Sequence, residues 1–263
     1  MSAKFAKYWF VIKVSLTAQL SYFWDLAGRS LFFVLILLIF HQLWGATLED
    51  AASDLSRNQL IWYLAAAEVI MLSTPSGRGL NVDEDIKSGN IAYLLNRPCS
   101  YPLFMFGRYW GEALASLLVN AIIGSLTALA LVGAPSLNPA ALPALLILLI
   151  LAVSLKFFLS LIISLTAFWV EESGPFHWIY GKLLFTIGGL FIPLEFFPGW
   201  LQQVSKALPF HLILYAPARM LVDWDPNRFF SILGNQALWL AAAAILAQLV
   251  FQRGVKKLNV HGG

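Results

Sequence analysis

The sequence predicts an all-α, polytopic membrane protein with six transmembrane helices, organised as a single transmembrane domain over residues 1–263. Hydrophobic residues make up 59% of the chain and charged residues only 12%, whereas a soluble domain has about 45–50% and about 25%. The mean hydropathy is +0.74, and the apolar residues gather into windows close to the length of about 20 residues that crosses a bilayer. A water-soluble protein of this size could not bury so much apolar surface, so a soluble enzyme is excluded.

Residue counts exclude three further classes. The 17 Lys and Arg residues are too few and too scattered for a nucleic-acid-binding face, and 14% aromatic residues is foreign to disordered chains. The single cysteine, Cys99, can form neither an intrachain disulfide nor a thiolate metal site. The 4 histidines lie far apart in the sequence, so we expect no metal-binding, catalytic or cofactor-binding residues in this chain.

Residues 1–24 predict an amphipathic helix that lies in the inner membrane surface. Apolar residues recur there at intervals of three or four and share one helical face: Phe5, Trp9, Ile12, Leu16, Leu20 and Phe23. Lys4 and Lys7 fall on the opposite face, and Lys13 lies at the edge, where its ammonium can reach the lipid headgroups. The alternative is a helix that packs against protein.

Six apolar windows predict the spans, over residues 25–48, 58–74, 104–132, 142–170, 178–193 and 229–251. With the N-terminus inside, twelve Lys and Arg residues fall in the inner segments and four in the outer ones: Arg57, Lys206, Arg219 and Arg228. Cytoplasmic loops carry an excess of Lys and Arg, so we expect both termini in the cytoplasm.

The segment 75–102 is the longest predicted cytoplasmic loop. Asp83, Glu84 and Asp85 open a short helix, since acidic side chains complement a positive helix end, and Gly89 ends it. An apolar patch follows, made of Ile91, Tyr93, Leu94 and Leu95. Charges beside apolar residues suggest a docking surface, and an ordinary solvated loop is an equal alternative.

The segment 193–228 predicts a broken, re-entrant hairpin on the outer side before the last span. Four prolines divide it into short pieces: Pro193, Pro198, Pro209 and Pro217. A short amphipathic helix is expected between Pro198 and Pro209, because Trp200, Leu201, Val204 and Leu208 recur at helical spacing. Broken backbone at membrane depth is tolerated only where protein or a water-filled cavity covers it.

Two ionisable residues, Glu68 and Lys156, lie deep within predicted spans. A charge at the bilayer centre costs about 2.5–3.5 kcal/mol, and this cost usually marks a partner or a transport pathway. A hydrogen-bonded helix contact for Glu68 and an ammonium that reaches the inner surface for Lys156 are the alternatives. The two lie at similar predicted depth, and whether they pair is left open.

This order of elements resembles the ABC-2 type permeases of ATP-binding cassette exporters over nearly the whole chain. The run Ser88-Gly89-Asn90-Ile91 and the run Leu94-Leu95-Asn96-Arg97-Pro98-Cys99-Ser100-Tyr101-Pro102 resemble the corresponding loop of a bacterial subgroup. The outer pieces Pro193-Leu194, Phe197-Pro198 and Leu208-Pro209-Phe210 are similar to the same subgroup.

The resemblance implies a multi-pass permease subunit of an exporter in the bacterial cytoplasmic (inner) membrane. Such a subunit pairs with a second permease, identical or different, docks on cytoplasmic ATPase subunits and moves a lipid, glycan, drug or peptide. By position in the family pattern, the ATPase-coupling residues are Asp83, Glu84, Asp85, Ile86, Lys87 and Gly89, and the outer gate is formed by Pro193, Phe197, Pro198 and Pro209. The chain holds no G-x-x-x-x-G-K-[ST] phosphate loop. We therefore expect no enzymatic activity here and expect ATP and Mg²⁺ on the partner.

Two other interpretations stay open. A stand-alone secondary transporter or channel would often carry internal repeats and several buried charges, and no clear repeat is found. A membrane-embedded enzyme would need converging catalytic side chains within the spans, and no HExxH, GxSxG or paired Asp motif occurs.

Overall fold

The computed structural model describes residues 3–47, 55–75, 80–135, 138–170 and 172–261, and within these ranges the chain forms helices and connecting turns without a β-strand. The α-helices of the first half are α1 (Ala3–Ser21), α2 (Phe23–Thr47), α3 (Arg57–Ser73), α4 (Val82–Lys87), α5 (Asn90–Leu95) and α6 (Tyr101–Val132). Those of the second half are α7 (Leu142–Ser164), α8 (Gly174–Thr186), α9 (Gly199–Ala207), α10 (Tyr215–Val222) and α11 (Pro226–His261). Short 3-10 helices lie between them: η2 (Pro139–Ala141), η3 (Leu165–Phe168), η4 (Leu194–Phe196) and η5 (Pro209–Leu212).

Four helical segments in the described ranges are long and apolar enough to cross a membrane: Leu26–Ala46, Tyr101–Val132, Leu142–Phe168 and Pro226–Lys257. They coincide with four of the six predicted windows. Their apolar side chains remain widely exposed on the surface of the single chain, as expected where lipid rather than water covers them. The all-α prediction is therefore confirmed for the described residues, and four of their segments have the length and apolar character of membrane spans.

The other two predicted windows form shorter helices. Helix α3 has 17 residues and α8 has 13, which at 1.5 Å per residue gives about 25 Å and about 20 Å, against a hydrocarbon core of about 30 Å. Local sequence explains both lengths. A capping box between Ser56 and Gln59 starts α3, and α8 stops before the turn at Gly188 and Gly189, where Gly189 has a φ of +74°. The count of six spans stays a prediction.

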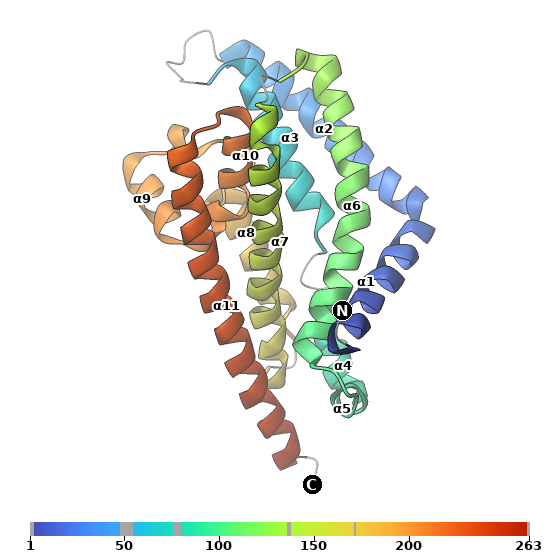
Figure 1. Ribbon diagram of the computed structural model, residues 1–263. Coiled ribbons are helices and arrows are strands. Elements are labelled where there is room, and N and C mark those ends of the chain that lie inside the picture. Colours follow the sequence, from blue (N-terminus) through green and yellow to red (C-terminus); the bar gives the residue numbers. More distant parts are fainter. Residues whose placement is uncertain (1–2, 48–54, 76–79, 136–137, 171, 262–263) are drawn as a thin grey trace.

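Helix α3 lies at the centre of the molecule and packs against α2, α6 and α10 (Figure 1). Its side chains are buried on nearly every side, including Leu60, Ile61, Tyr63, Leu64 and Ala67. A helix that is apolar all round is typical of a buried position. Helix α3 is thus the element around which the longer helices are arranged.

Helix α1 packs lengthwise on the first half of α6. The contact is close because α6 presents Gly107 and Gly111, four residues apart, to the backbone of α1; a Cβ atom built on Gly111 would lie 2.5 Å from the Ile12 carbonyl oxygen. Trp9 and Phe10 point away from the protein and are exposed. One face of α1 therefore packs on α6. The position of α1 in the membrane surface stays a prediction. Residues 1–2 of the predicted helix lie outside the described residues.

The two ends of the bundle differ in character. Figure 1 shows the N-terminal end of α1, the C-terminal end of α11 and the pair α4–α5 in its lower half, whereas the broken pieces η4, α9, η5 and α10 lie in its upper half. Helix α9 confirms the short helix that the sequence predicts between Pro198 and Pro209. The chain therefore places its two candidate functional segments toward opposite ends.

Candidate functional site

Helices α4 and α5 hold the predicted coupling residues, and Asp83 ties them to the rest of the molecule. The Asp83 carboxylate accepts hydrogen bonds from the Ser173 backbone N–H, at 2.7 Å, and from the Ser173 hydroxyl, at 2.7 Å and 2.9 Å. Ser173 directly precedes α8, and α4 also packs on η3 at the end of α7. Asp83 thus links α4 to the connection between α7 and α8.

Asp85 makes a second set of links, to α5 and α6. Its carboxylate accepts a hydrogen bond from the Asn90 side-chain amide at 2.8 Å and another from the Tyr101 hydroxyl at 3.1 Å. Asn90 begins α5 and Tyr101 begins α6. Asp83 and Asp85 therefore form hydrogen bonds within the protein, and their position in the sequence did not predict these partners.

Several side chains of this segment are exposed, and four of them form what we call the α4–α5 surface: Glu84, Lys87, Tyr93 and Arg97. Tyr93 is 65% exposed, and the Arg97 guanidinium lies over its ring at 4.9 Å from the centroid. Ile86 is half-buried and Gly89 is exposed.

The interior side of α4 and α5 is apolar. Ile91 and Leu94 are buried in the core. Within the apolar patch predicted from the sequence, Tyr93 is the most exposed large side chain. Gly89 joins the two helices with a φ of +73°, a conformation that glycine adopts without strain. Of the predicted loop 75–102, residues 76–79 lie outside the described part.

The two buried charges lie in the interior, and neither is the other's hydrogen-bonding partner. The Lys156 ammonium donates to the Met71 carbonyl oxygen at 3.2 Å and to the Thr74 hydroxyl. Met71 and Thr74 belong to the last turn and the C-cap of α3, where carbonyl groups lack helical partners and the helix dipole favours a cation. Glu68 lies one turn earlier on α3 and is 1% exposed; within the described residues its Oε1 atom has no hydrogen-bond partner.

A chain of buried polar side chains joins three helices near these charges. The Ser30 hydroxyl of α2 donates to Asn120 Oδ1 of α6 at 2.9 Å, and Asn120 Nδ2 donates to the Ser73 hydroxyl of α3 at 3.0 Å. All three side chains are buried. The sequence did not predict this contact, because each of the three residues is a single polar residue within an apolar window.

The predicted outer-gate residues differ in exposure. Pro193 and Pro209 are buried, Phe197 is half-buried and Pro198 is exposed. They bound η4 and α9, which fold back beside α10. The structure brings the four residues to one segment, and whether that segment gates a pathway stays a prediction.

A charged cluster that the sequence analysis missed holds this segment together. Glu195 Oε1 accepts hydrogen bonds from the Tyr215 hydroxyl at 2.8 Å and from Arg219 Nε at 2.8 Å, and Arg219 also pairs with Asp223 at 2.8 Å. Burial, and then the nearby Glu195 carboxylate, raises the pKa of Tyr215 above its usual value of 10.0, so this phenol stays a donor. Arg219, which the sequence analysis only counted among the outer cations, is 6% exposed.

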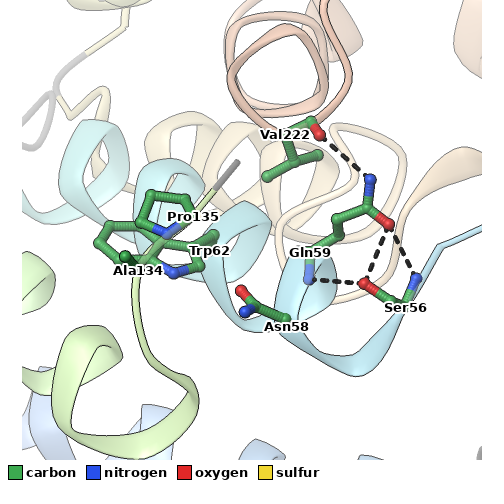
Figure 2. Close-up of a pocket in the computed structure, with 7 residues that line it drawn as sticks. All are labelled: Ser56, Asn58, Gln59, Trp62, Ala134, Pro135 and Val222. Carbon is green, nitrogen blue, oxygen red and sulfur yellow. Dashed lines mark hydrogen bonds between the residues drawn. The ribbon is translucent and has the colours of Figure 1, made fainter. Parts of the chain in front are cut away.

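Two cavities lie side by side at this end of the molecule. Figure 2 shows the first, which we call the polar pocket; it has a volume of about 340 Å³ and is lined by Ser56, Asn58, Gln59, Trp62, Ala134, Pro135 and Val222. Gln59 donates to the Val222 carbonyl oxygen at 3.2 Å, and Trp62 Nε1 donates to the Gly133 carbonyl oxygen at 3.1 Å. The second, the apolar groove, has a volume of about 320 Å³ and shares Trp62 with the first.

The described side chains offer no cluster of three or more His, Cys, Asp or Glu residues that could hold a metal ion. A comparison with protein families matches residues 23–262 to the family model described as ABC-2 family transporter protein. No curated protein matches the chain.

Proposed function

The chain belongs to the ABC-2 family of transporter proteins, and on this premise we propose that it is the permease subunit of an ATP-driven exporter. In this proposal it pairs with a second permease and docks on cytoplasmic ATPase subunits, which bind ATP and Mg²⁺. The cargo class is a lipid, glycan, drug or peptide. The ATP chemistry resides on the partner, since the chain carries no phosphate loop.

The observation that carries the proposal is the way the α4–α5 surface is attached. Asp83 connects it to the start of α8 through Ser173, and Asp85 connects it to the start of α6 through Tyr101. A force on Glu84, Lys87 or Tyr93 is therefore transmitted to the starts of α6 and α8 through charge-assisted hydrogen bonds. A subunit driven from outside needs a connection of this kind.

The proposed arrangement in the membrane follows the excess of Lys and Arg on one side. Helices α2, α3, α6, α7, α8 and α11 then cross in alternating directions, with α3 and α8 completed by their flanking residues. The α4–α5 surface faces the cytoplasm of a bacterial cell, and the segment 193–228 faces outward as a re-entrant hairpin.

Purification of the tagged chain from its native membrane tests the proposal. We expect a second protein with a G-x-x-x-x-G-K-[ST] sequence to co-purify with it. Combined replacement of Glu84, Lys87, Tyr93 and Arg97 by Ala should abolish this co-purification, because these side chains form the exposed face of α4 and α5. Replacement of Gln203 and Lys206 by Ala on α9, where both are exposed, is the matched control and should leave it intact.

Two results would contradict the proposal. One is purification of the intact chain without any ATPase while it still transports, which would favour a stand-alone transporter or channel. The other is equal ATPase retention by the α4–α5 variant and the α9 variant, which would place the docking surface elsewhere.

A further inference from the structure

The apolar groove lies between two of the helices that cross the membrane. Its floor is formed by α3 through small residues, Ala65 and Ala66, and its walls come from α6 and α7 through Ala121, Ser125 and Leu146. Leu146 is 57% exposed at the mouth, and Ile122, beside Ala121, is 60% exposed. Since α6 and α7 are candidate spans, the mouth of the groove opens sideways toward lipid.

The groove and the polar pocket together have the polarity of an amphiphile. Among the described residues, those that line the groove are uncharged, whereas Ser56, Asn58 and Gln59 line the adjoining pocket. Trp62 lies at the boundary between them and bonds through its indole N–H to the carbonyl oxygen of Gly133, just after α6 ends. Tryptophan in such a position is typical of the membrane–water interface.

The size of the groove selects its occupant. A volume of about 320 Å³ is at the lower end of the range for small-ligand sites, about 300–1,000 Å³. An apolar cavity also excludes water, and its walls lose dispersion contacts when nothing fills it. Within a bilayer, the apolar group available to fill such a groove is a lipid acyl chain.

We propose that this composite cavity binds a membrane phospholipid, with one acyl chain in the groove between α6 and α7 and the headgroup at Ser56, Asn58 and Gln59. The described residues that line the two cavities are uncharged, so a zwitterionic headgroup suits them better than an anionic one. This proposal rests on the proposed function in one respect: the orientation proposed above places the site in the outer leaflet. The site lies apart from the α4–α5 surface, whereas Val69 and Ile70 of its lining are neighbours of Glu68 and Met71 on α3.

Filling the groove from its floor and wall tests the proposal. The complex is purified with Ala66→Leu and Ala121→Leu together, and its bound phospholipid is counted by native mass spectrometry. Retention should fall by about tenfold or more, because the burial of a few methylene groups accounts for that factor. The same change at Ala242→Leu, exposed on α11 and outside the groove, should leave retention unchanged.

A second measurement reads the site in a chain that keeps Ala66 and Ala121. In a Cys99→Ser background, Ser125→Cys is labelled with a small fluorophore and the protein is placed in nanodiscs with brominated-chain phosphatidylcholine. Bromine in the groove should quench this label, and the two Leu substitutions should relieve the quenching. A label at Ala242→Cys should be quenched in both cases, since that position faces bulk lipid.

Three results would overturn the site. The first is equal phospholipid retention with and without the Leu substitutions, and the second is the absence of quenching at Ser125→Cys. The third is a disulfide cross-link between two copies of the unlabelled Ser125→Cys chain, which would show that a second chain covers the groove. These readouts need neither ATP nor transport, so failure of the proposed ATPase docking leaves them interpretable.

Discussion

Lys156 lies where α3 ends, and this position determines what its removal should do. Its ammonium satisfies the Met71 carbonyl oxygen and contacts the Thr74 hydroxyl, whereas Glu68 lies a turn away without a hydrogen bond to it. In double-mutant cycles, we expect Lys156→Met and Thr74→Val to couple by about 0.5–3 kcal/mol, as contacting residues do. Lys156→Met and Glu68→Gln should couple more weakly, because these two buried side chains attract each other electrostatically without a hydrogen bond. Thermal unfolding in detergent measures both, and a stronger coupling to Glu68 would contradict the helix-end assignment.

Glu195 is the acceptor on which the outer cluster depends. Glu195→Ala removes a charge-assisted bond to buried Arg219 and a bond to Tyr215, and loss of a hydrogen bond to a charged group costs about 1.5–3 kcal/mol. Glu195→Gln should lose less, since its amide oxygen still accepts from Tyr215. The unfolding midpoint in detergent should therefore fall in the order wild type, Gln, Ala. Equal midpoints for all three would mean that Asp223 alone satisfies Arg219.

At the scale of elements, the contact between α1 and α6 depends on Gly111. A Cβ atom there would lie 2.5 Å from the Ile12 carbonyl oxygen and 2.5 Å from Ser15 Cβ, so Gly111→Ala should push α1 away and destabilise the protein by about 1–3 kcal/mol. Gly234→Ala on α11 is the matched control, because nothing lies within 4 Å of its Cβ position. That change should be neutral or stabilise the helix by up to about 1 kcal/mol. Equal behaviour of the two variants would show that α1 is only loosely held.

The elements themselves were predictable where composition alone decides them. Long apolar windows gave the four spanning segments, and the Pro198–Pro209 spacing gave α9. The partners across space were not predictable, because one sequence carries no record of which faces meet. Asp83 and Asp85 were predicted as acidic residues at a helix start, without partners, and they are bonded to Ser173 and Tyr101. Arg219 was only counted among the outer cations, and it is buried against Glu195.

At the scale of the whole molecule, the two ends of the bundle should lie on opposite sides of the membrane. Gln203 on α9 is exposed, so Gln203→Cys should react with an impermeant thiol reagent added to intact cells. The native cysteine, Cys99, lies at the opposite end between α5 and α6 and is an internal control that should react only after the membrane is opened. Reaction of Gln203→Cys only in opened cells would invert the proposed orientation.

A link through Asp83 and Ser173 predicts that binding of the ATPase and transmission of its movement can be separated. Ser173→Ala removes the hydroxyl bonds to Asp83 and leaves Glu84, Lys87, Tyr93 and Arg97 untouched, so the ATPase should still co-purify. The effect of ATP on the outer segment should fall by about tenfold, since the loss of one hydrogen bond to a carboxylate costs about 1.5–3 kcal/mol. The ATP-dependent change in the labelling rate of Gln203→Cys measures this without a known cargo.

The control for that experiment is Ser88→Ala. It removes a hydroxyl whose bonds stay within the α4–α5 segment: the hydroxyl donates to the Glu84 carbonyl oxygen at 2.7 Å and accepts from the Asn90 backbone N–H at 3.4 Å. It should keep both ATPase binding and the ATP-dependent change at Gln203. If Ser173→Ala keeps the change as well, movement does not pass through Asp83, and the link from Asp85 to Tyr101 at the start of α6 becomes the route to test. If Ser173→Ala loses the ATPase itself, the α4–α5 surface depends on this bond for its shape, and docking and transmission are one event in this protein.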